Sequence, residues 1–324
     1  MITLKNICKN FRVARRSAGF GRAVKALFSR EYELVHALAD VSFTIGDGEM
    51  VGYIGPNGAG KSTTVKIMCG VLTPDSGECV VDGRTPWRDR IAHAREIGVV
   101  FGQRSQLWWD VPVTDSFELI RDIYEVNEKD YIRSLDELTD LLDLAGILKT
   151  PARSLSLGQR MRCEIAASLL HNPRTLFLDE PTIGLDAVSK IAVRSFIKKL
   201  NAERGVTVVL TTHDKQDIEA LTERILLIGR GRILLDGGLD ELKKRASANK
   251  TLVAEYAGRA PELCEGMTLI EKKEGRLAVA LDPALISASD AITRFAAQTE
   301  LSDVSVSGVS AEEMVAALYR EYKI

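Results

Sequence analysis

The sequence predicts an α/β fold built on a mainly parallel β-sheet, with a further strand outside that sheet, and three observations support this prediction. Met50–Ile54 is a short apolar run, typical of a buried parallel strand, and helix-compatible residues follow it after a glycine-rich loop. Similar apolar runs recur along the chain and end in polar residues. Residues 1–11 instead alternate between apolar and polar side chains, which predicts a half-exposed strand outside that sheet.

The glycine-rich loop Gly55-Pro56-Asn57-Gly58-Ala59-Gly60-Lys61-Ser62 fits the phosphate-binding pattern G-x-x-x-x-G-K-[ST] at every fixed position. Its glycines let the backbone N–H groups turn inward, and the following helix adds its positive N-terminal end. We expect Lys61 to reach the β- and γ-phosphates and the Ser62 hydroxyl to bind magnesium. A turn that binds nothing is the competing interpretation, and the flanking strand and helix argue against it.

Composition and charge describe an ordinary globular protein. The chain has 324 residues, 45% of them apolar, and a net charge of −2, so it lacks a global basic field for nucleic acid. Its five cysteines form no C-x-x-C pair, as expected of a reduced cytosolic protein. We recognise no secretion signal and no run of about 18 apolar residues that would span a membrane. Any membrane function would therefore need another chain.

An insertion separates the first two predicted strands, residues 1–11 and Val41–Ile45. We assign it to residues 12–35, and between Arg12 and Arg30 it holds six basic residues and no acidic one. Apolar residues recur there at helical spacing, which predicts a basic amphipathic arm. The arm is either a solvated excursion or a contact with anionic headgroups or a membrane partner.

The later strands end in residues suited to phosphate chemistry. Gln103, Asp179-Glu180 and His213 each follow an apolar run, and ligands bind at the carboxyl ends of parallel strands. We expect Asp179 to hold magnesium and Glu180 to polarise the attacking water. His213 could bind the γ-phosphate, and Gln103 could ligate magnesium or position water. The strands in front of these residues are predicted at Ile97–Phe101, Leu176–Leu178 and Val206–Thr211, and two further strands are predicted at Glu78–Val81 and Arg224–Ile228.

Two regions differ from this α/β pattern. Residues 104–170 are rich in leucine and acidic side chains and predict a helical subdomain. Residues 246–324 predict a small α+β domain of open function, after a domain that covers 1–245. Its strands are expected at Leu252–Tyr256, Leu277–Leu281 and Val304–Ser307, and its helices at 286–298 and 310–320.

A second predicted anion site is Leu155-Ser156-Leu157-Gly158-Gln159, where a serine and a glycine open a helix. With this segment the chain resembles the ATP-binding cassette (ABC) ATPases, whose signature reads L-S-G-G-Q. The resemblance covers about residues 1–240 with every motif in order. It implies a P-loop NTPase fold with a mainly parallel core sheet, an antiparallel β subdomain and a helical signature subdomain.

The resemblance also implies roles for the motifs. Gln103 would be the Q-loop glutamine, Asp179 the Walker B aspartate, Glu180 the catalytic base and His213 the switch histidine. Magnesium would lie between Ser62, Gln103 and Asp179. ATP would be bound by Gly55, Asn57, Gly58, Ala59, Gly60, Lys61, Ser62 and Thr63 of the Walker A loop.

In this family two cassettes dimerise head to tail, so one copy's signature would close over ATP held by the other. Ser156, Gly158 and Gln159 are the expected signature contacts, together with Asp186 in the D-loop Gly184-Leu185-Asp186. Leu157 replaces a family glycine, which would slow hydrolysis without abolishing it.

Three aromatic positions have alternative interpretations. Phe11 stands where the family stacks an aromatic ring on adenine, but Tyr32 could compete for this role and Phe11 could belong to the core. Trp108 and Trp109 extend the Q-loop and either contact membrane subunits or pack in the core.

The sequence thus predicts a Mg²⁺-dependent ATPase subunit at the cytoplasmic face of a membrane. It would pair with a second cassette, most simply an identical one, and with separate polytopic permease subunits, without nucleic acid. The inserted arm and the C-terminal domain favour an exporter of the drug, lipid or polysaccharide type. The alternatives are a soluble ABC ATPase that remodels a protein or nucleic-acid partner and, among transporters, an importer.

Overall fold

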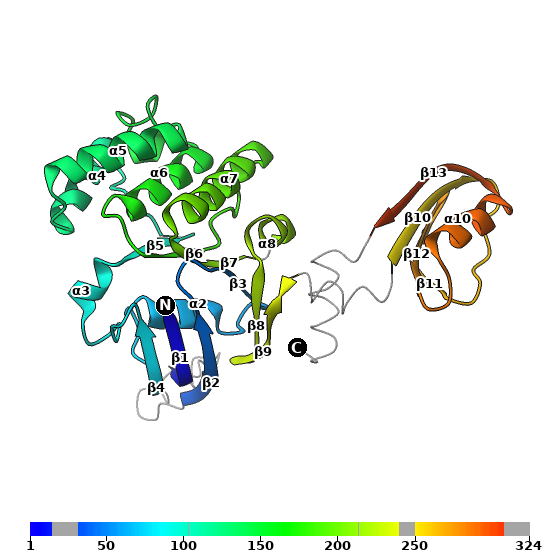
Figure 1. Cartoon of the computed structure of the whole chain (residues 1–324), viewed down its shortest axis with the longest axis horizontal. Helices are drawn as coiled ribbons and strands as arrows, with labels where there is room; N and C mark the ends of the chain where they lie inside the picture. The colour runs from blue at the N-terminus through cyan, green and yellow to red at the C-terminus, as the bar shows by residue number, and fades with distance from the viewer. Residues whose placement is uncertain (15–31, 103, 213, 240–249, 308–324) are drawn as a thin grey trace, which may run out of the picture. The chain divides into compact units, whose positions relative to one another are not determined.

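The computed structural model describes residues 1–14, 32–102, 104–212, 214–239 and 250–307 (Figure 1). The chain divides into two compact units, Met1–Asp236 and Gly237–Ile324. The domain boundary predicted at 245/246 falls in the segment 240–249, outside the described residues.

The first unit is built on a six-stranded sheet in the order β5-β6-β7-β3-β8-β9. In this order, each of the first five strands, β5-β6-β7-β3-β8, runs parallel to its neighbours among them. The last strand, which the sequence analysis missed, follows β8 through the turn Arg230–Gly231, so it can only be antiparallel. The predicted α/β fold with a mainly parallel core sheet is confirmed. The strands are β3 (Met50–Ile54), β5 (Ile97–Phe101), β6 (Thr175–Asp179), β7 (Thr207–Thr211), β8 (Arg224–Gly229) and β9 (Arg232–Gly238).

Both faces of this sheet are buried, because successive strand side chains point to opposite sides. In β6, Leu176 and Leu178 join the core beneath one group of helices, whereas Phe177 joins the core on the other face. The first core contains α4 (Val113–Ile123), α5 (Glu128–Leu142), α6 (Leu157–Leu169) and α7 (Ala187–Arg204). The opposite core contains α2 (Lys61–Met68). Shorter helices are α3 (Arg90–Ala94), η1 (Ala152–Ser154) and α8 (Lys215–Leu221).

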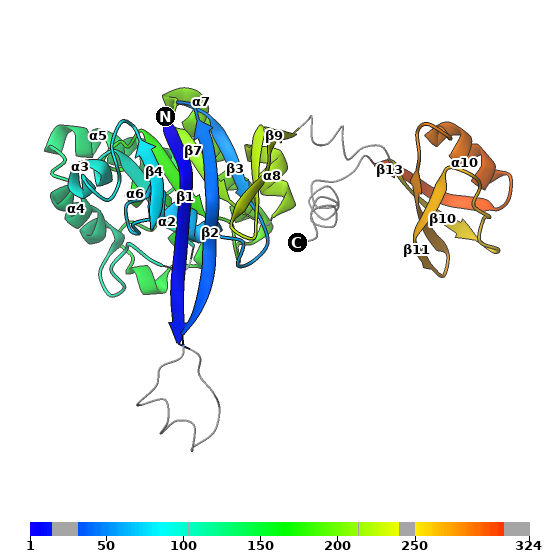
Figure 2. The same cartoon turned by 90° about the horizontal axis from the view of Figure 1, so that it is seen from below.

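A three-stranded antiparallel sheet in the order β2-β1-β4 packs on the α2 side. Figure 2 shows β1 (Ile2–Ala14) and β2 (Tyr32–Ile45) side by side as one long hairpin, with β4 (Ser76–Val81) next to β1. The two strands extend into both ends of the predicted inserted arm, 12–35. Backbone pairing continues to Ala14 and Tyr32, although the side chains of Tyr32 and Leu34 are exposed. Residues 15–31 of the arm, with its expected helix, lie outside the described residues.

The second unit contains a four-stranded antiparallel sheet in the order β11-β12-β10-β13. Leu252, Val279 and Phe295 form the centre of its core. Strand β11 was not predicted, because it is an edge strand whose side chains are almost all exposed. The predicted helix 310–320 lies outside the described residues. The elements are β10 (Lys250–Ala257), β11 (Met267–Lys273), β12 (Arg276–Leu281), α10 (Ala288–Ala296) and β13 (Glu300–Ser307).

Candidate nucleotide-binding site

The glycine-rich loop joins β3 to α2, and its geometry requires glycine at two positions. Gly60 has φ +114°, and an added Cβ would lie 2.7 Å from Leu38 Cδ2 and 2.8 Å from the carbonyl oxygen of Ala37. A Cβ at Gly55 would lie 2.3 Å from the carbonyl oxygen of Ile228. Because Gly60 is the N-cap of α2, no side chain of the cap accepts hydrogen bonds from the first turn. The N–H groups at this helix end are therefore suited to bind an anion.

Lys61 places a cation at the base of the loop. Its side-chain Nζ donates hydrogen bonds to the carbonyl oxygens of Gly55 (2.6 Å) and Pro56 (3.2 Å). The residue is 6% exposed, and burial lowers the pKa of its ammonium group, although Glu180 and Asp179 oppose this shift. A phosphate would offer this ammonium charge-assisted hydrogen bonds in place of the bonds to backbone carbonyls.

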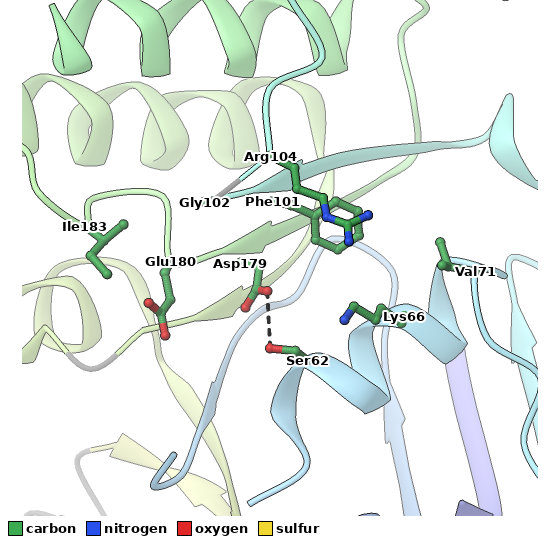
Figure 3. A pocket seen from close by; sticks show the side chains of 9 residues that line it. All are labelled: Ser62, Lys66, Val71, Phe101, Gly102, Arg104, Asp179, Glu180 and Ile183. Atoms are coloured by element: carbon green, nitrogen blue, oxygen red, sulfur yellow. Dashed lines mark hydrogen bonds between the residues drawn. The ribbon is translucent and has the colours of Figure 1, made fainter. Parts of the chain in front are cut away.

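Beside the loop, Ser62, Asp179 and Glu180 line one cavity of about 380 Å³ (Figure 3). The Ser62 hydroxyl donates to Asp179 Oδ2 at 3.3 Å, and the Thr211 hydroxyl donates to Asp179 Oδ1. Asp179 and Thr211 are adjacent because they are register partners at the ends of β6 and β7. A hydroxyl and a carboxylate oxygen are donors that Mg²⁺ prefers, so Ser62 and Asp179 fit this ion.

Glu180 adopts an unusual backbone conformation, with φ +57°. Its N–H donates to the carbonyl oxygen of Thr211 (2.9 Å), and its carbonyl oxygen accepts from the N–H of Ile183 (3.2 Å). Non-glycine residues with positive φ store strain of about 1 kcal/mol and are frequent at functional sites. The sharp turn after Asp179 lets two consecutive carboxylates face the same cavity (Figure 3).

The Ser156 segment opens α6 with a complete capping box. Ser156 Oγ accepts from the N–H of Gln159 (3.2 Å), and Gln159 Oε1 accepts from the N–H of Ser156 (2.9 Å). A Cβ added to Gly158 would lie 2.4 Å from Ser189 Oγ on α7, so this glycine allows close helix packing. None of these three residues is among those that line the cavity of Figure 3.

Asp186 begins α7 as its N-cap. Its carboxylate accepts from the N–H of Ser189 at 2.9 Å and from the Ser189 hydroxyl at 2.8 Å. These hydrogen bonds favour the ionised form, so they lower the pKa of Asp186. The carboxylate is therefore held at the start of α7.

Comparison with known proteins identifies the family. Residues 38–183 match the family described as "ABC transporter". The Daunorubicin resistance ATP-binding protein DrrA3 of Streptomyces coeruleorubidus is 34% identical over 224 residues, which are 69% of this chain and 70% of that protein. The chain belongs to the ABC transporter family. The Methionine import ATP-binding protein MetN of Latilactobacillus sakei is 30% identical over 246 residues, which are 72% of this chain and 70% of that protein.

A solved structure supports the same conclusion about the cassette. It is the dimeric post-hydrolysis state of the ATP-binding cassette MJ0796 bound to ADP and Pi, with 28% identity and a TM-score of 0.61. The match covers 74% of this chain and 99% of that one. The resemblance to ABC transporter ATP-binding proteins is confirmed. Among the described residues, no helix of the cassette is long and apolar enough to cross a membrane.

The other predicted site residues differ in burial, and two of them lie outside the described residues. Phe11 is half-buried in β1, with Lys9 Nζ 5.7 Å from its ring centroid. Tyr32 pairs with Ala14, farther along the hairpin. Gln103 and His213 lie outside the described residues. In the phosphate loop and first turn of α2, Asn57, Gly58 and Ser62 are exposed, Ala59 is buried and Thr63 is half-buried.

The Q-loop tryptophans are on the surface of the cassette. Trp108 is 60% exposed and Trp109 is 53% exposed, so the alternative that they pack in the core is wrong. The Arg160 guanidinium lies 5.9 Å from the Trp109 ring. A surface position leaves both rings accessible to a partner.

Sequence analysis did not identify three residues around the cavity of the cassette. Thr211 orients the Asp179 carboxylate, and Lys66 and Arg104 contribute basic groups to the lining. Thr211 could have been found, because it ends an apolar strand in front of Thr212-His213, as Asp179 ends β6. The positions of Lys66 and Arg104 depend on how α2 packs beside the end of β5.

Proposed function

We propose that this cassette hydrolyses ATP with Mg²⁺ and that hydrolysis drives export through a membrane transporter. The observation that carries the proposal is the cavity beside the glycine-rich loop, where Ser62, Asp179 and Glu180 converge. This set supplies a phosphate-binding loop, two oxygen donors for a cation and one further carboxylate as a base.

In the proposed mechanism, the N–H groups of the loop and the Lys61 ammonium bind the β- and γ-phosphates. Ser62 and Asp179 would hold Mg²⁺, whose charge would help to neutralise the phosphate oxygens. Glu180 accepts a proton from the water that attacks the γ-phosphorus, and the bond from that phosphorus to the β–γ bridging oxygen breaks. Gln103 and His213 keep the roles that the family resemblance implies.

We further propose that the ATP site is completed by a second cassette. Ser156, Gly158 and Gln159 do not line the cavity of their own chain, and the related MJ0796 structure is dimeric. In a head-to-tail dimer, these residues and Asp186 would approach the nucleotide of the partner. ATP would thereby join the cassettes, and hydrolysis would release them.

Separate polytopic permease subunits would bind this dimer at the cytoplasmic face of a membrane, with no role for nucleic acid. The exposed Trp108 and Trp109 are suited to this contact, since interface anchors are enriched in tryptophan. The drug-resistance name of DrrA3 supports export. Import is the second candidate, and the name of MetN favours it.

The hydrolysis proposal is tested with Glu180→Gln, which keeps the size of the side chain but removes the base. We expect Mg²⁺-ATP to convert this variant into a stable dimer, measured by size-exclusion chromatography, while phosphate release falls at least about 100-fold. Lys61→Ala is the control and should bind ATP more weakly without accumulating as a dimer. Wild-type hydrolysis by Glu180→Gln would contradict the assigned base.

The transport proposal is tested by isolating the tagged wild-type protein from native membranes in mild detergent, with mass spectrometry of the proteins that accompany it. We expect one or two polytopic membrane proteins in stoichiometric amounts. Recovery of soluble partners alone, or of ribosomes or DNA, would favour a remodelling ATPase instead.

A further inference from the structure

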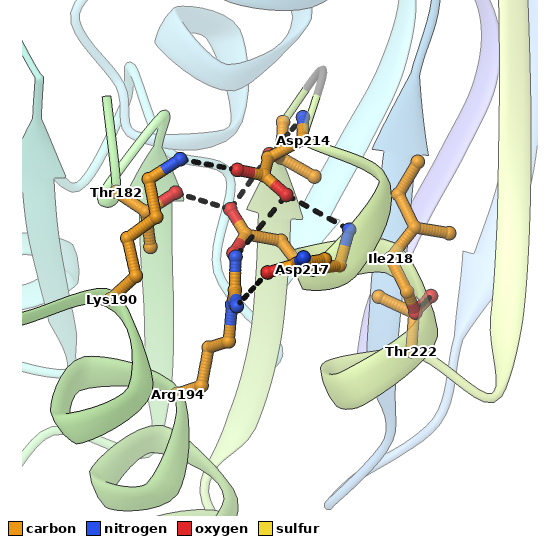
Figure 4. A network of polar contacts seen from close by, with 9 residues as sticks. Thr182, Lys190, Arg194, Asp214, Asp217, Ile218 and Thr222 are labelled. Carbon is orange, nitrogen blue, oxygen red and sulfur yellow. Dashed lines mark hydrogen bonds and ion pairs between the residues drawn. The ribbon is translucent and has the colours of Figure 1, made fainter. Parts of the chain in front are cut away.

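Asp217 on α8 is a fully buried carboxylate with donors from three separate segments (Figure 4). It accepts hydrogen bonds from the hydroxyl of Thr182, from the hydroxyl of Thr212 (2.9 Å) and from Nε of Arg194 (2.5 Å). A carboxylate buried away from water needs protein hydrogen-bond donors in its place. Because these hydrogen bonds are directional, they restrict where each donating segment can lie. Asp217 therefore joins the loop after β6, the loop after β7 and helix α7.

Arg194 extends this connection from α7. It is 8% exposed, and its other nitrogens donate to Gln216 Oε1 (2.9 Å) and Asp214 Oδ1 (3.2 Å). Lys190, one turn earlier on α7, also pairs with Asp214 (Figure 4). The planar guanidinium thus fixes three positions around the start of α8.

The segments held in this way carry the proposed hydrolytic residues. Thr182 is two residues after Glu180, while Thr212 and Asp214 are the neighbours of His213 in the sequence. The N–H of Asp214 also donates to Thr212 Oγ1 at 2.9 Å. Neither Asp217 nor Arg194 lines the cavity of Figure 3, so neither is placed to touch the nucleotide.

Stability alone is a poor explanation for this pair, since a buried ion pair is often no more stabilising than apolar residues of similar volume. Directed hydrogen bonds, in contrast, determine relative position. We propose that Asp217 and Arg194 are positioning residues for ATP hydrolysis: they hold the turn after Glu180 and both neighbours of His213 in one fixed arrangement. This inference rests on the proposed function.

The test removes single hydroxyl groups from the purified full-length protein and measures ATPase kinetics. In Thr182→Val and Thr212→Val we expect kcat to fall about tenfold or more, with KM for ATP changed less than about twofold, because the phosphate loop is untouched. Thr182→Ser and Thr212→Ser keep the hydroxyl and should recover kcat to within about twofold of wild type. Lys199→Gln, on the exposed part of α7, is the matched control and should retain wild-type kinetics.

Wild-type kcat in both valine variants would overturn the inference, as would equal losses in the valine and serine variants. Asp217→Asn provides a further check, since it removes the charge that balances Arg194 and should lower kcat with the same small effect on KM. The Glu180→Gln measurement separates the two proposals. If that variant is inactive while both valine variants are fully active, only the positioning role fails; if it is fully active, the proposed hydrolysis site fails.

Discussion

His171 allows a quantitative prediction about acid stability. Its ring stacks on Tyr124 with a centroid distance of 3.9 Å, and its Nε2 donates to the carbonyl oxygen of Ile97 at 2.9 Å. Nδ1 is buried and has no hydrogen-bond partner among the described residues. Burial therefore disfavours the imidazolium and lowers the pKa of His171 from 6.5 to about 4.

The sign follows from proton linkage. Because the pKa of His171 is lower in the folded state, unfolding takes up a proton when the pH falls below 6.5, and the folded state loses stability until about pH 4. Between pH 7 and pH 5 the loss from this group is about 2 kcal/mol. With a urea m-value of about 2.5 kcal/mol per M, the midpoint would fall by about 0.8 M.

The assay is urea unfolding followed by tryptophan fluorescence. All three tryptophans, Trp87, Trp108 and Trp109, belong to the unit Met1–Asp236, so their emission reports on the unit that contains His171. His171→Gln is the comparison, since glutamine keeps an N–H donor and does not titrate. Contributions of other groups cancel between the two proteins. Equal losses of stability from pH 7 to pH 5 in both would refute the reasoning.

Two glycines give further predictions. Gly60→Ala should reduce ATP binding in a fluorescent-nucleotide titration and destabilise the protein by at least about 2 kcal/mol, because it combines φ +114° with two close contacts. Gly58→Ala is its control: φ is +80°, but no atom lies within 4 Å, so a smaller loss of about 1 kcal/mol is expected and an equal loss would contradict the contact argument. Gly158→Ala should impair ATP-dependent dimerisation in the Glu180→Gln background, measured by size-exclusion chromatography. Adding Ser189→Gly, which removes the two atoms that would lie within 3 Å, should restore it. The Ser189→Gly single variant is the control, because it also loses the hydroxyl that donates to Asp186; no recovery in the double variant while this control dimerises would contradict packing against α7 as the cause.

The sequence by itself determined the local elements that carry the site. Alternation and apolar runs located β3, β5, β6 and β7 to within a residue or two, because a buried parallel strand must be apolar on both faces. The glycine-rich loop was also recognisable, since its backbone needs glycine at particular positions. Strand β11 was missed because its side chains are almost all exposed, and β9 because most of its side chains are half-buried on both faces, so pairing rather than apolar patterning defines both strands.

Only the tertiary structure decided which distant residues meet. The parallel register of β6 and β7 brings Thr211 to Asp179, and the positive φ of Glu180 turns a second carboxylate toward the same cavity. The sequence also does not show that Trp108 and Trp109 are exposed or that Asp217 is buried. From sequence alone, two adjacent tryptophans are as easily expected in the core, and a single aspartate is expected on the surface. The physical reason is that strand and helix patterns depend on near neighbours, whereas burial and hydrogen-bond partners depend on segments brought together by packing.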